Sequence, residues 1–228
     1  MWLIDSSMNI LALHASPRRK NSNTLILLEA VLEGCRNEGA ATEMIDLAYA
    51  AIGYCRGCGT CYKTGSCVQE DDFQEIFAKF LAADGIVLSS PNYIMNVTAP
   101  MKAFFDRLGD AIHCQQGTGK YGCSVATAGG SKSAEVCSYM NSVLQVLGAT
   151  TVGEVAVDIA GNPTAFTRAL PEAKELGATL VRAIAEEWHD PVQDVFHQEM
   201  HENMKGLILS DREAFAHEIA YWSEKGWL

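Results

Sequence analysis

Four cysteines stand close together in the stretch CRGCGTCYKTGSC, with the spacing Cys-x2-Cys-x2-Cys-x5-Cys. They are Cys55, Cys58, Cys61 and Cys67. Four thiolates can hold a [4Fe–4S] cube, one on each iron, and cysteines at intervals of three can wrap one face of it. The glycines between them allow the backbone to approach a cluster closely. These residue types and this spacing point to iron–sulfur chemistry.

Two other interpretations of the cysteine stretch remain open. Zinc also accepts four thiolates, although zinc sites more often use two Cys-x2-Cys pairs with a long spacer. The spacing therefore favours a cluster over zinc, and a set of reduced thiols without metal is the third alternative. The other four cysteines are scattered in apolar surroundings, where single cysteines behave as small hydrophobic residues. We expect them in or near the core: Cys35, Cys114, Cys123 and Cys137.

A second candidate site is the stretch HASPRRKNSNT, which leaves a predicted strand and enters a predicted helix. The N-terminus of a helix offers unpaired N–H groups and a partial positive charge. Hydroxyl and amide groups add donors, and Arg18 adds a charged fork that suits phosphate oxygens. The polar residues are Ser16, Ser22, Asn23 and Thr24. Together they suit a phosphate monoester, and the alternative is a solvated turn with an ordinary helix cap.

The stretch SPNYIMNVTAPMKAFFDR contains a third candidate, the loop from Ser90 to Thr98. It lies between a predicted strand and a helix that begins near Thr98, with Pro100 in its first turn, where proline is tolerated. Asn92, Tyr93 and Met95 in this loop can contact a flat ligand. The alternative is a surface loop with ordinary aromatic packing.

The elements that must position these loops alternate between strand-like and helix-like segments. Short apolar runs predict strands at 9–15, 42–47, 85–90, 121–128 and 150–159. A helix is predicted after each strand. The first ends near residue 39, the second opens with a capping box at Asp72 and Glu75, and the fourth ends near residue 148. The fifth runs from about 171 to 188. Short apolar strands with intervening helices predict a parallel sheet covered on both faces, hence a three-layer doubly wound α/β domain with five strands.

In such a sheet, ligands lie outside the carboxyl ends of the strands. This rule selects the loops 16–23, 48–70, 90–98 and 127–133. The loop at 48–70 is long for a compact domain, and long loops are usually functional. All three candidate sites therefore fall where the fold places its ligands.

The tail differs from the domain that precedes it. We predict one domain over residues 1–190, with the cysteine-rich loop at 48–70, and a helical tail over 191–228. A second capping box, Ser210 and Glu213, predicts a helix start. Because a large apolar surface usually marks an interface, we expect a homodimer or homotetramer with the tail in its contacts. The alternative is that the tail packs on its own domain. Its apolar residues are Phe196, Met200, Met204, Phe215, Ile219, Trp222 and Trp227.

Composition excludes several classes of protein. The chain has 228 residues and a formal net charge of -11, so neither nucleic acid nor an anionic membrane surface is an expected partner. No apolar run approaches the ~20 residues of a membrane span. The start MWLIDSSMNIL lacks a basic region and is a poor signal peptide. We expect a cytoplasmic protein, in which disulfides are uncommon.

Three stretches together resemble the NADPH-dependent FMN reductase family, which has a flavodoxin-like fold: SPRRKNSNT, SPNYIMNVTAPMKAFFDR and ATAGG. The cysteine spacing and the closing EIAYWSEKGWL are similar to its iron–sulfur flavoprotein branch. One departure is Ala15, where the family usually has glycine. The branch forms dimers that pair into tetramers, which agrees with the expectation for the tail.

The resemblance implies a role for each matching residue. Ser16, Arg18, Ser22, Asn23 and Thr24 would hold the FMN phosphate. Pro91, Asn92, Tyr93, Ile94, Met95 and Asn96 would line the ring and the ribityl chain. Thr127, Ala128, Gly129 and Gly130 would close the other side of the ring. The four clustered cysteines would bind a [4Fe–4S] cluster.

A protein with both groups would convert between one-electron and two-electron partners, because FMN accepts two electrons and releases them singly. We expect electrons from a small ferredoxin-like carrier or from NAD(P)H, and no side chain stands out as a catalytic acid or base. Two alternatives remain. One is an NAD(P)H-dependent flavin or quinone reductase without a cluster, and the other is a zinc-stapled binding module without redox activity.

Overall fold

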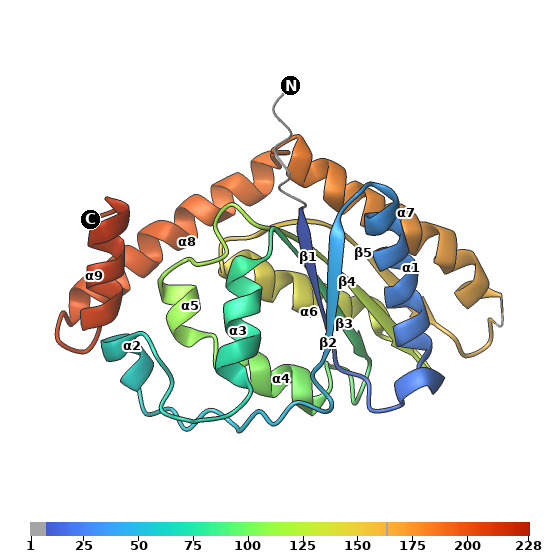
Figure 1. The fold of residues 1–228 in the computed structure, drawn as a ribbon, viewed down its shortest axis with the longest axis horizontal. Coiled ribbons are helices and arrows are strands. Elements are labelled where there is room, and N and C mark those ends of the chain that lie inside the picture. The colour runs from blue at the N-terminus through green and yellow to red at the C-terminus, as the bar shows by residue number, and fades with distance from the viewer. Residues whose placement is uncertain (1–7, 163) are drawn as a thin grey trace.

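A five-stranded parallel sheet forms the centre of the protein (Figure 1). The computed structural model describes residues 8–162 and 164–228; residues 1–7, the poor signal peptide considered above, lie outside the described part. The strands follow the order β2-β1-β3-β4-β5, as the doubly wound prediction requires. They are β1 (Asn9–His14), β2 (Ala41–Asp46), β3 (Gly85–Pro91), β4 (Tyr121–Ala128) and β5 (Thr150–Asp158).

Helices cover both faces of the sheet. One face is covered by α1 (Asn23–Asn37) and α7 (Ala165–Ala185), and the other by α3 (Phe73–Ala82), α4 (Ala99–Phe105) and α6 (Ser133–Val146). Side chains of β1 alternate between the two cores: Leu11 and Leu13 join α3, α4 and α6, whereas Ile10 and Ala12 join α1 and α7. The predicted three-layer flavodoxin-like architecture is confirmed, and all four scattered cysteines are buried, as expected.

The remaining helices lie outside these layers. They are the 3-10 helix η1 (Arg19–Asn21), the short helices α2 (Thr60–Thr64) and α5 (Gly109–His113), and the tail helices α8 (Pro191–Ser210) and α9 (Ala216–Lys225). Helix α8 extends along the upper left of Figure 1 and brings α9 to the side of the domain that carries α2 and α5. The end of the chain therefore lies beside the cysteine loop.

Two predicted helix starts are wrong, and a third helix starts at the predicted residue without the predicted capping box. Helix α7 begins at Ala165, before Pro171, which lies inside it. Helix α3 begins after Asp72 without a capping box, because the Asp72 carboxylate accepts a hydrogen bond from the Ala51 N–H instead. Ser210 ends α8 rather than opening a helix, and α9 starts only at Ala216. Serine and aspartate side chains can also hydrogen-bond to backbone groups that are not at a helix start. A capping-box pattern in the sequence therefore does not by itself locate the first residue of a helix.

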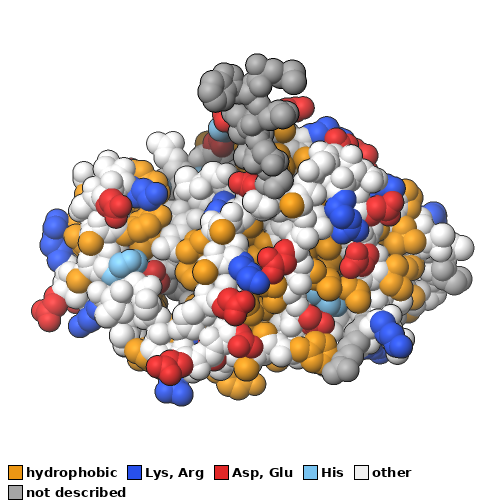
Figure 2. All heavy atoms as spheres, in the orientation of Figure 1, with side chains coloured by type: hydrophobic (Ala, Val, Ile, Leu, Met, Phe, Trp, Pro, Cys, Tyr) orange, Lys and Arg blue, Asp and Glu red, His pale blue; other side chains and the backbone are white. Residues whose placement is uncertain are grey.

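Surface charges of both signs are interspersed over the face shown in Figure 2. Lys79, for example, pairs with Glu43 and Glu75 across the outer surface of β2 and α3. Among the described residues, no helix is long and apolar enough to cross a membrane.

Helices α1 and α7 approach each other closely at two glycines. A Cβ atom added at Gly177 would lie 1.9 Å from the Val31 carbonyl oxygen, and one added at Gly34 would lie 2.0 Å from the Lys174 carbonyl oxygen. Real Cβ atoms do not approach oxygen so closely. The short distance between α1 and α7 is therefore possible because glycine has no side chain at these two positions. This contact fixes α1, whose first turn carries part of the predicted phosphate site.

Replacement of Gly177 by alanine should force α1 and α7 apart. We expect the free energy of unfolding to fall by about 1–3 kcal/mol, the usual cost of overpacking, measured by urea denaturation. Gly206 of α8 is the matched control, because a Cβ atom there meets nothing within 4 Å. Gly206→Ala should raise stability by up to about 1 kcal/mol, since alanine is the better helix former. Equal effects of the two substitutions would contradict the close contact.

Candidate functional site

Three of the predicted loops meet at the carboxyl edge of the sheet. The hydroxyls of Thr24 in α1 and Thr127 in β4 share a hydrogen bond of 2.5 Å. The Asn92 backbone N–H donates to the Thr127 carbonyl oxygen at 2.8 Å, and the Asn92 side-chain amide donates to the Ser131 carbonyl oxygen at 2.7 Å. Hydrogen bonds therefore connect three of the loops predicted from the sequence. They are the predicted phosphate loop at the start of α1, the 90–98 loop and the 127–133 loop.

The phosphate loop combines buried hydroxyls with an exposed cation. Ser16 and Thr24 are each 1% exposed, whereas Arg18 is exposed. The Ser22 hydroxyl caps α1 by accepting from the Leu25 N–H, so the helix-cap alternative is realised at this residue. A serine that caps a helix still has a hydroxyl proton to donate. The loop thus presents donors around the first turn of α1, where a helix attracts anions.

Ala15, which precedes the predicted phosphate loop, lies in the core. It is fully buried, its N–H donates to the Ser89 carbonyl oxygen, and its own carbonyl oxygen accepts from the Thr98 hydroxyl at 2.7 Å. The departure from the family glycine is therefore accommodated inside the domain.

The 90–98 loop ends in a tight turn with a strained backbone. Tyr93 and Asn96 exchange backbone hydrogen bonds. Between them, Ile94 and Met95 have φ values of 49° and 65°, a region that β-branched residues rarely adopt. The side chain of Ile94 is 97% exposed and that of Met95 is 65% exposed. The turn therefore projects apolar side chains into solvent at a backbone cost of roughly 1–3 kcal/mol per residue.

Open space and an unpaired acceptor adjoin this turn. The Oδ1 atom of Asn92 is buried and has no hydrogen-bond partner among the described residues. A Cβ atom added at Gly129 or Gly130 would meet nothing within 4 Å. A buried acceptor without a partner is uncommon in proteins and needs an explanation. A ligand N–H group would provide it.

All four clustered cysteines line one cavity of about 80 Å³. Cys55 and Cys58 are exposed, and Cys61 and Cys67 are partly buried. Burial, together with the nearby Asp110 carboxylate, raises the pKa of the Cys61 thiol to about 11. At Cys58, a hydrogen bond from the Thr60 hydroxyl lowers the pKa of the thiol. The four thiols thus meet at one cavity, but their environments differ.

The sulfur atoms of the cysteine loop are not gathered around one point. Within the described cysteine loop, no three Sγ atoms lie all within 4.8 Å of one another. A tetrahedral zinc ion with Zn–S bonds of about 2.3 Å would hold its sulfurs about 3.8 Å apart, so zinc would require the thiols to move closer together.

Side chains that follow the loop hold its backbone in place. The Asp71 carboxylate accepts from the Gly53 N–H at 2.8 Å, and the Gln69 amide donates to the Tyr54 carbonyl oxygen at 3.1 Å. The Gln74 amide donates to the Cys67 carbonyl oxygen at 3.0 Å. These bonds replace the secondary structure that residues 51–59 lack.

A buried arginine beside the cysteines was missed by sequence reasoning. Arg107 lines the cysteine cavity, and its side chain is only 1% exposed. Its Nη1 pairs with Asp71 and its guanidinium lies 4.3 Å from the centre of the Phe73 ring. Its Nε and Nη2 atoms have no partner among the described residues. The available signal was an arginine two residues after the apolar pair Phe104 and Phe105.

Helix α9 and the residue before it pack against the cysteine loop. The Tyr62 ring stacks on His113 at 4.7 Å and lies 5.8 Å from Phe215, which precedes α9. The His217 ring packs on Gly65, where an added Cβ atom would lie 2.6 Å from its Nε2 atom. Sequence reasoning missed this contact as well, because nothing in the local pattern links residues so far apart in the chain.

The strand order and the loops at the carboxyl edge define a flavodoxin-like α/β protein. The sequence profile described as NADPH-dependent FMN reductase matches residues 8–162. An iron–sulfur flavoprotein of Archaeoglobus fulgidus is 34% identical over 223 residues, which cover 97% of this chain and 100% of the relative. The chain belongs to the NADPH-dependent FMN reductase family and is a homologue of the iron–sulfur flavoproteins, as the resemblance predicted.

Solved structures share the fold. An NAD(P)H:quinone oxidoreductase from Methanothermobacter marburgensis aligns with a TM-score of 0.62 and 22% identity, over 81% of this chain and 100% of that chain. RosB, solved with bound 8-demethyl-8-formylriboflavin-5'-phosphate, aligns with a TM-score of 0.63 and 16% identity, over 86% of this chain and 88% of that chain. At these identities the likeness establishes the fold alone.

Thiol reactivity should follow the two environments in the loop. In reduced, metal-free protein near pH 8, we expect iodoacetamide to modify Cys58 faster than Cys61, because the thiolate is the reactive form. Peptide mass spectrometry would measure both rates. Thr60→Val should slow the modification of Cys58, because it removes the hydroxyl that lowers the pKa of the thiol. Thr64→Val is the control and should leave the rate unchanged, because the Thr64 hydroxyl bonds to backbone groups of Thr60 and Ser66. Equal rates at the two cysteines would contradict the difference in pKa.

Proposed function

We propose that this chain is an electron-transfer iron–sulfur flavoprotein that binds FMN at the carboxyl edge of the sheet and a [4Fe–4S] cluster in the cysteine cavity. It passes electrons between a donor, either a ferredoxin-like carrier or NAD(P)H, and an acceptor. The observation that carries the proposal is the convergence on one cavity of four thiols with the spacing Cys-x2-Cys-x2-Cys-x5-Cys.

The residues of the carboxyl edge suit FMN. Ser16, Ser22 and Thr24 offer hydroxyls to the phosphate, Asn23 offers its amide and the first turn of α1, and exposed Arg18 is free to reach the phosphate oxygens. RosB, which shares the fold, was solved with a flavin phosphate. The phosphate would then lie at the anion-attracting end of α1.

The 90–98 loop suits the flavin ring. The unpaired Oδ1 atom of Asn92 would accept from the ring's N–H group. Tyr93 and Met95 offer apolar surface to the ring. The strained turn at Ile94 and Met95 would present backbone groups to the ring edge. Pro91, Asn96, Thr127, Ala128, Gly129 and Gly130 would complete the lining.

The cysteine cavity suits a cluster with a net negative charge. Cys55, Cys58, Cys61 and Cys67 would each ligate one iron. The two unpaired nitrogens of Arg107 would donate hydrogen bonds in the cavity and offset the charge of the thiolates. An arginine that is buried with an incomplete set of partners is costly unless such an acceptor is present.

When bound, FMN supplies two-electron chemistry that can be split into single electrons, and the cluster supplies one-electron transfer. The chain would hold the phosphate, orient the ring, and cover one side of the cysteine cavity with the Tyr62 ring. A flavin or quinone reductase that uses NAD(P)H without a cluster is the second candidate, supported by the quinone oxidoreductase of the same fold.

We also propose that the protein is a homodimer or homotetramer. Helix α8 exposes Val192 and Val195, with exposed fractions of 79% and 58%. By contrast, Trp222 of α9 is fully buried within the chain and Phe215 is partly buried. The contact would therefore use α8 rather than α9. Light scattering of the intact protein that gave the mass of one chain would reject this proposal.

The two cofactor sites should be separable by substitution. After purification without oxygen, the intact protein should contain FMN, iron and acid-labile sulfide. Cys58→Ser should lose iron and sulfide but keep FMN. Arg18→Ala should weaken FMN binding by about 1.5–3 kcal/mol, the range for a hydrogen bond to a charged group, and keep the iron. Arg36→Ala, at the far end of α1, is the control. Stoichiometric zinc without sulfide in the intact protein would reject the cluster.

Arg107 should tune the reduction potential of the cluster. Arg107→Lys keeps the charge but removes the planar set of donors. We therefore expect the cluster to form with a lower reduction potential. A redox titration monitored by electron paramagnetic resonance would measure that potential. Lys102→Arg on the exposed surface of α4 is the control. An unchanged potential in the folded Arg107→Lys protein would remove Arg107 from the cluster environment.

A further inference from the structure

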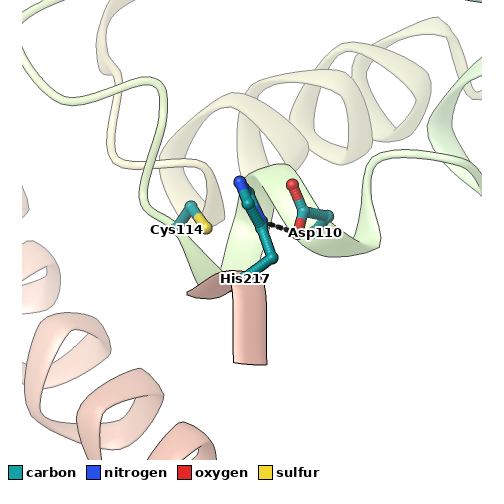
Figure 3. Close-up of side chains that lie close together, drawn as sticks. All are labelled: Asp110, Cys114 and His217. Carbon is teal, nitrogen blue, oxygen red and sulfur yellow. Dashed lines mark hydrogen bonds and ion pairs between the residues drawn. The ribbon is translucent and has the colours of Figure 1, made fainter. Parts of the chain in front are cut away.

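Three side chains of types that bind metal ions lie together between α5 and α9. Asp110 belongs to α5, Cys114 follows it, and His217 belongs to α9 (Figure 3). Each offers one donor atom, and the three atoms lie within 4.8 Å of one another. The Asp110 Oδ1 and His217 Nδ1 atoms are 3.0 Å apart. None of these residues belongs to the flavin site or to the four clustered cysteines.

The arrangement has the residue types of a Cys-His-Asp catalytic triad, but burial excludes that role. Cys114 is fully buried, and burial raises the pKa of its thiol, with further increases from the Asp110 and Glu218 carboxylates. A buried thiol in this state is not a nucleophile, because the thiolate is the reactive form. A substrate also has no route to the sulfur.

A second buried pair makes the region rich in acceptors. His113 Nδ1 lies 2.9 Å from the Glu218 Oε1 atom. The Glu218 side chain is fully buried, and its Oε2 atom has no hydrogen-bond partner among the described residues. Two buried carboxylates and a buried thiol thus lie close together, and the imidazoles of His113 and His217 pair with the two carboxylates. Such a group needs a cation or protons to balance it.

We propose that Asp110, Cys114 and His217 bind one divalent transition-metal ion of the zinc or ferrous type. Oxygen, sulfur and nitrogen donors of this kind suit these ions. Ligands around a tetrahedral zinc ion lie about 3.3–3.8 Å apart, so small side-chain movements would complete the site. The fourth position would be taken by water or by the unpaired Glu218 oxygen. The His217 side chain is 27% exposed, which leaves a route in for the ion.

The ion would join the tail to the domain beside the cysteine loop. Asp110 and Cys114 lie in and after α5, whereas His217 lies in α9 and packs on Gly65 of the loop. A bond through the metal would fix α9 in the position where Phe215 contacts Tyr62. Because the Cys114 thiol loses its proton on binding, metal affinity should fall as the pH falls.

Cobalt binding to a full-length chain without the clustered cysteines tests the site. In the variant with serine at positions 55, 58, 61 and 67, we expect about one cobalt ion per chain, with thiolate-to-cobalt charge-transfer absorption. Cys114→Ser should remove that absorption. Asp110→Asn and His217→Gln should weaken binding at least about tenfold, the lower bound for loss of even an outer-shell partner. His189→Gln, whose side chain is 77% exposed, is the control.

A folded four-serine chain that binds no cobalt would overturn the proposal, and so would binding that the three ligand substitutions leave unchanged. If the four-serine chain does not fold, analysis of zinc and iron in the intact protein decides. One zinc ion, or one iron beyond the four of a cluster, that the intact protein binds and His217→Gln loses supports the site. Absence of both, or retention of the ion in the variant, rejects it. FMN content should be equal in both proteins, so failure of this site is distinguishable from failure of the flavin site.

Discussion

The parallel direction of all five strands is the constraint on which the site depends. Because every strand ends at the same edge, the loops that follow β1, β2, β3 and β4 leave the sheet side by side. The hydrogen bond between Thr24 and Thr127 then joins the first helix to the fourth strand. A ligand at this edge contacts segments that are separated in sequence but held by one rigid sheet.

The cysteine site depends on a different kind of contact. Its backbone has little regular structure and is held by side chains such as Asp71 and Gln69. The segment that opens α9 packs on this loop from outside, through Phe215 and His217. The carboxyl edge is thus built by the sheet, whereas the cysteine cavity is lined by the loop, by α2 and by the residues around Arg107. The two parts of one proposed redox chain have different structural supports.

Much of the fold could be predicted because buried parallel strands leave continuous apolar runs. The run NILALHA and the run YGCSVATA each correspond to a strand at nearly the predicted residues. The cysteine spacing likewise predicted that four thiols would meet. In each case the signal is local in sequence, and periodicity or spacing expresses it directly.

Other features could not be predicted because no local pattern encodes them. The burial of Arg107 results from packing against Phe73 and Asp71, which belong to a different element. The contact of His217 with Gly65 joins segments on opposite sides of the domain sequence. Cap residues misled the placement of α9, because Ser210 bonds back to the Leu207 carbonyl oxygen within α8. Tertiary partners decided these cases rather than propensity.

The position of α9 has a consequence for the order in which the protein matures. A chain emerging from the ribosome exposes residues 55–67 long before residues 216–225 are made, and domains begin to fold from the N-terminal side during synthesis. The sheet can form while the segment 215–217, which packs on Tyr62 and Gly65 of the loop, is still absent. Insertion of the proposed cluster at that stage would precede the packing of α9. Helix α9 would then close on a loop that already holds its iron.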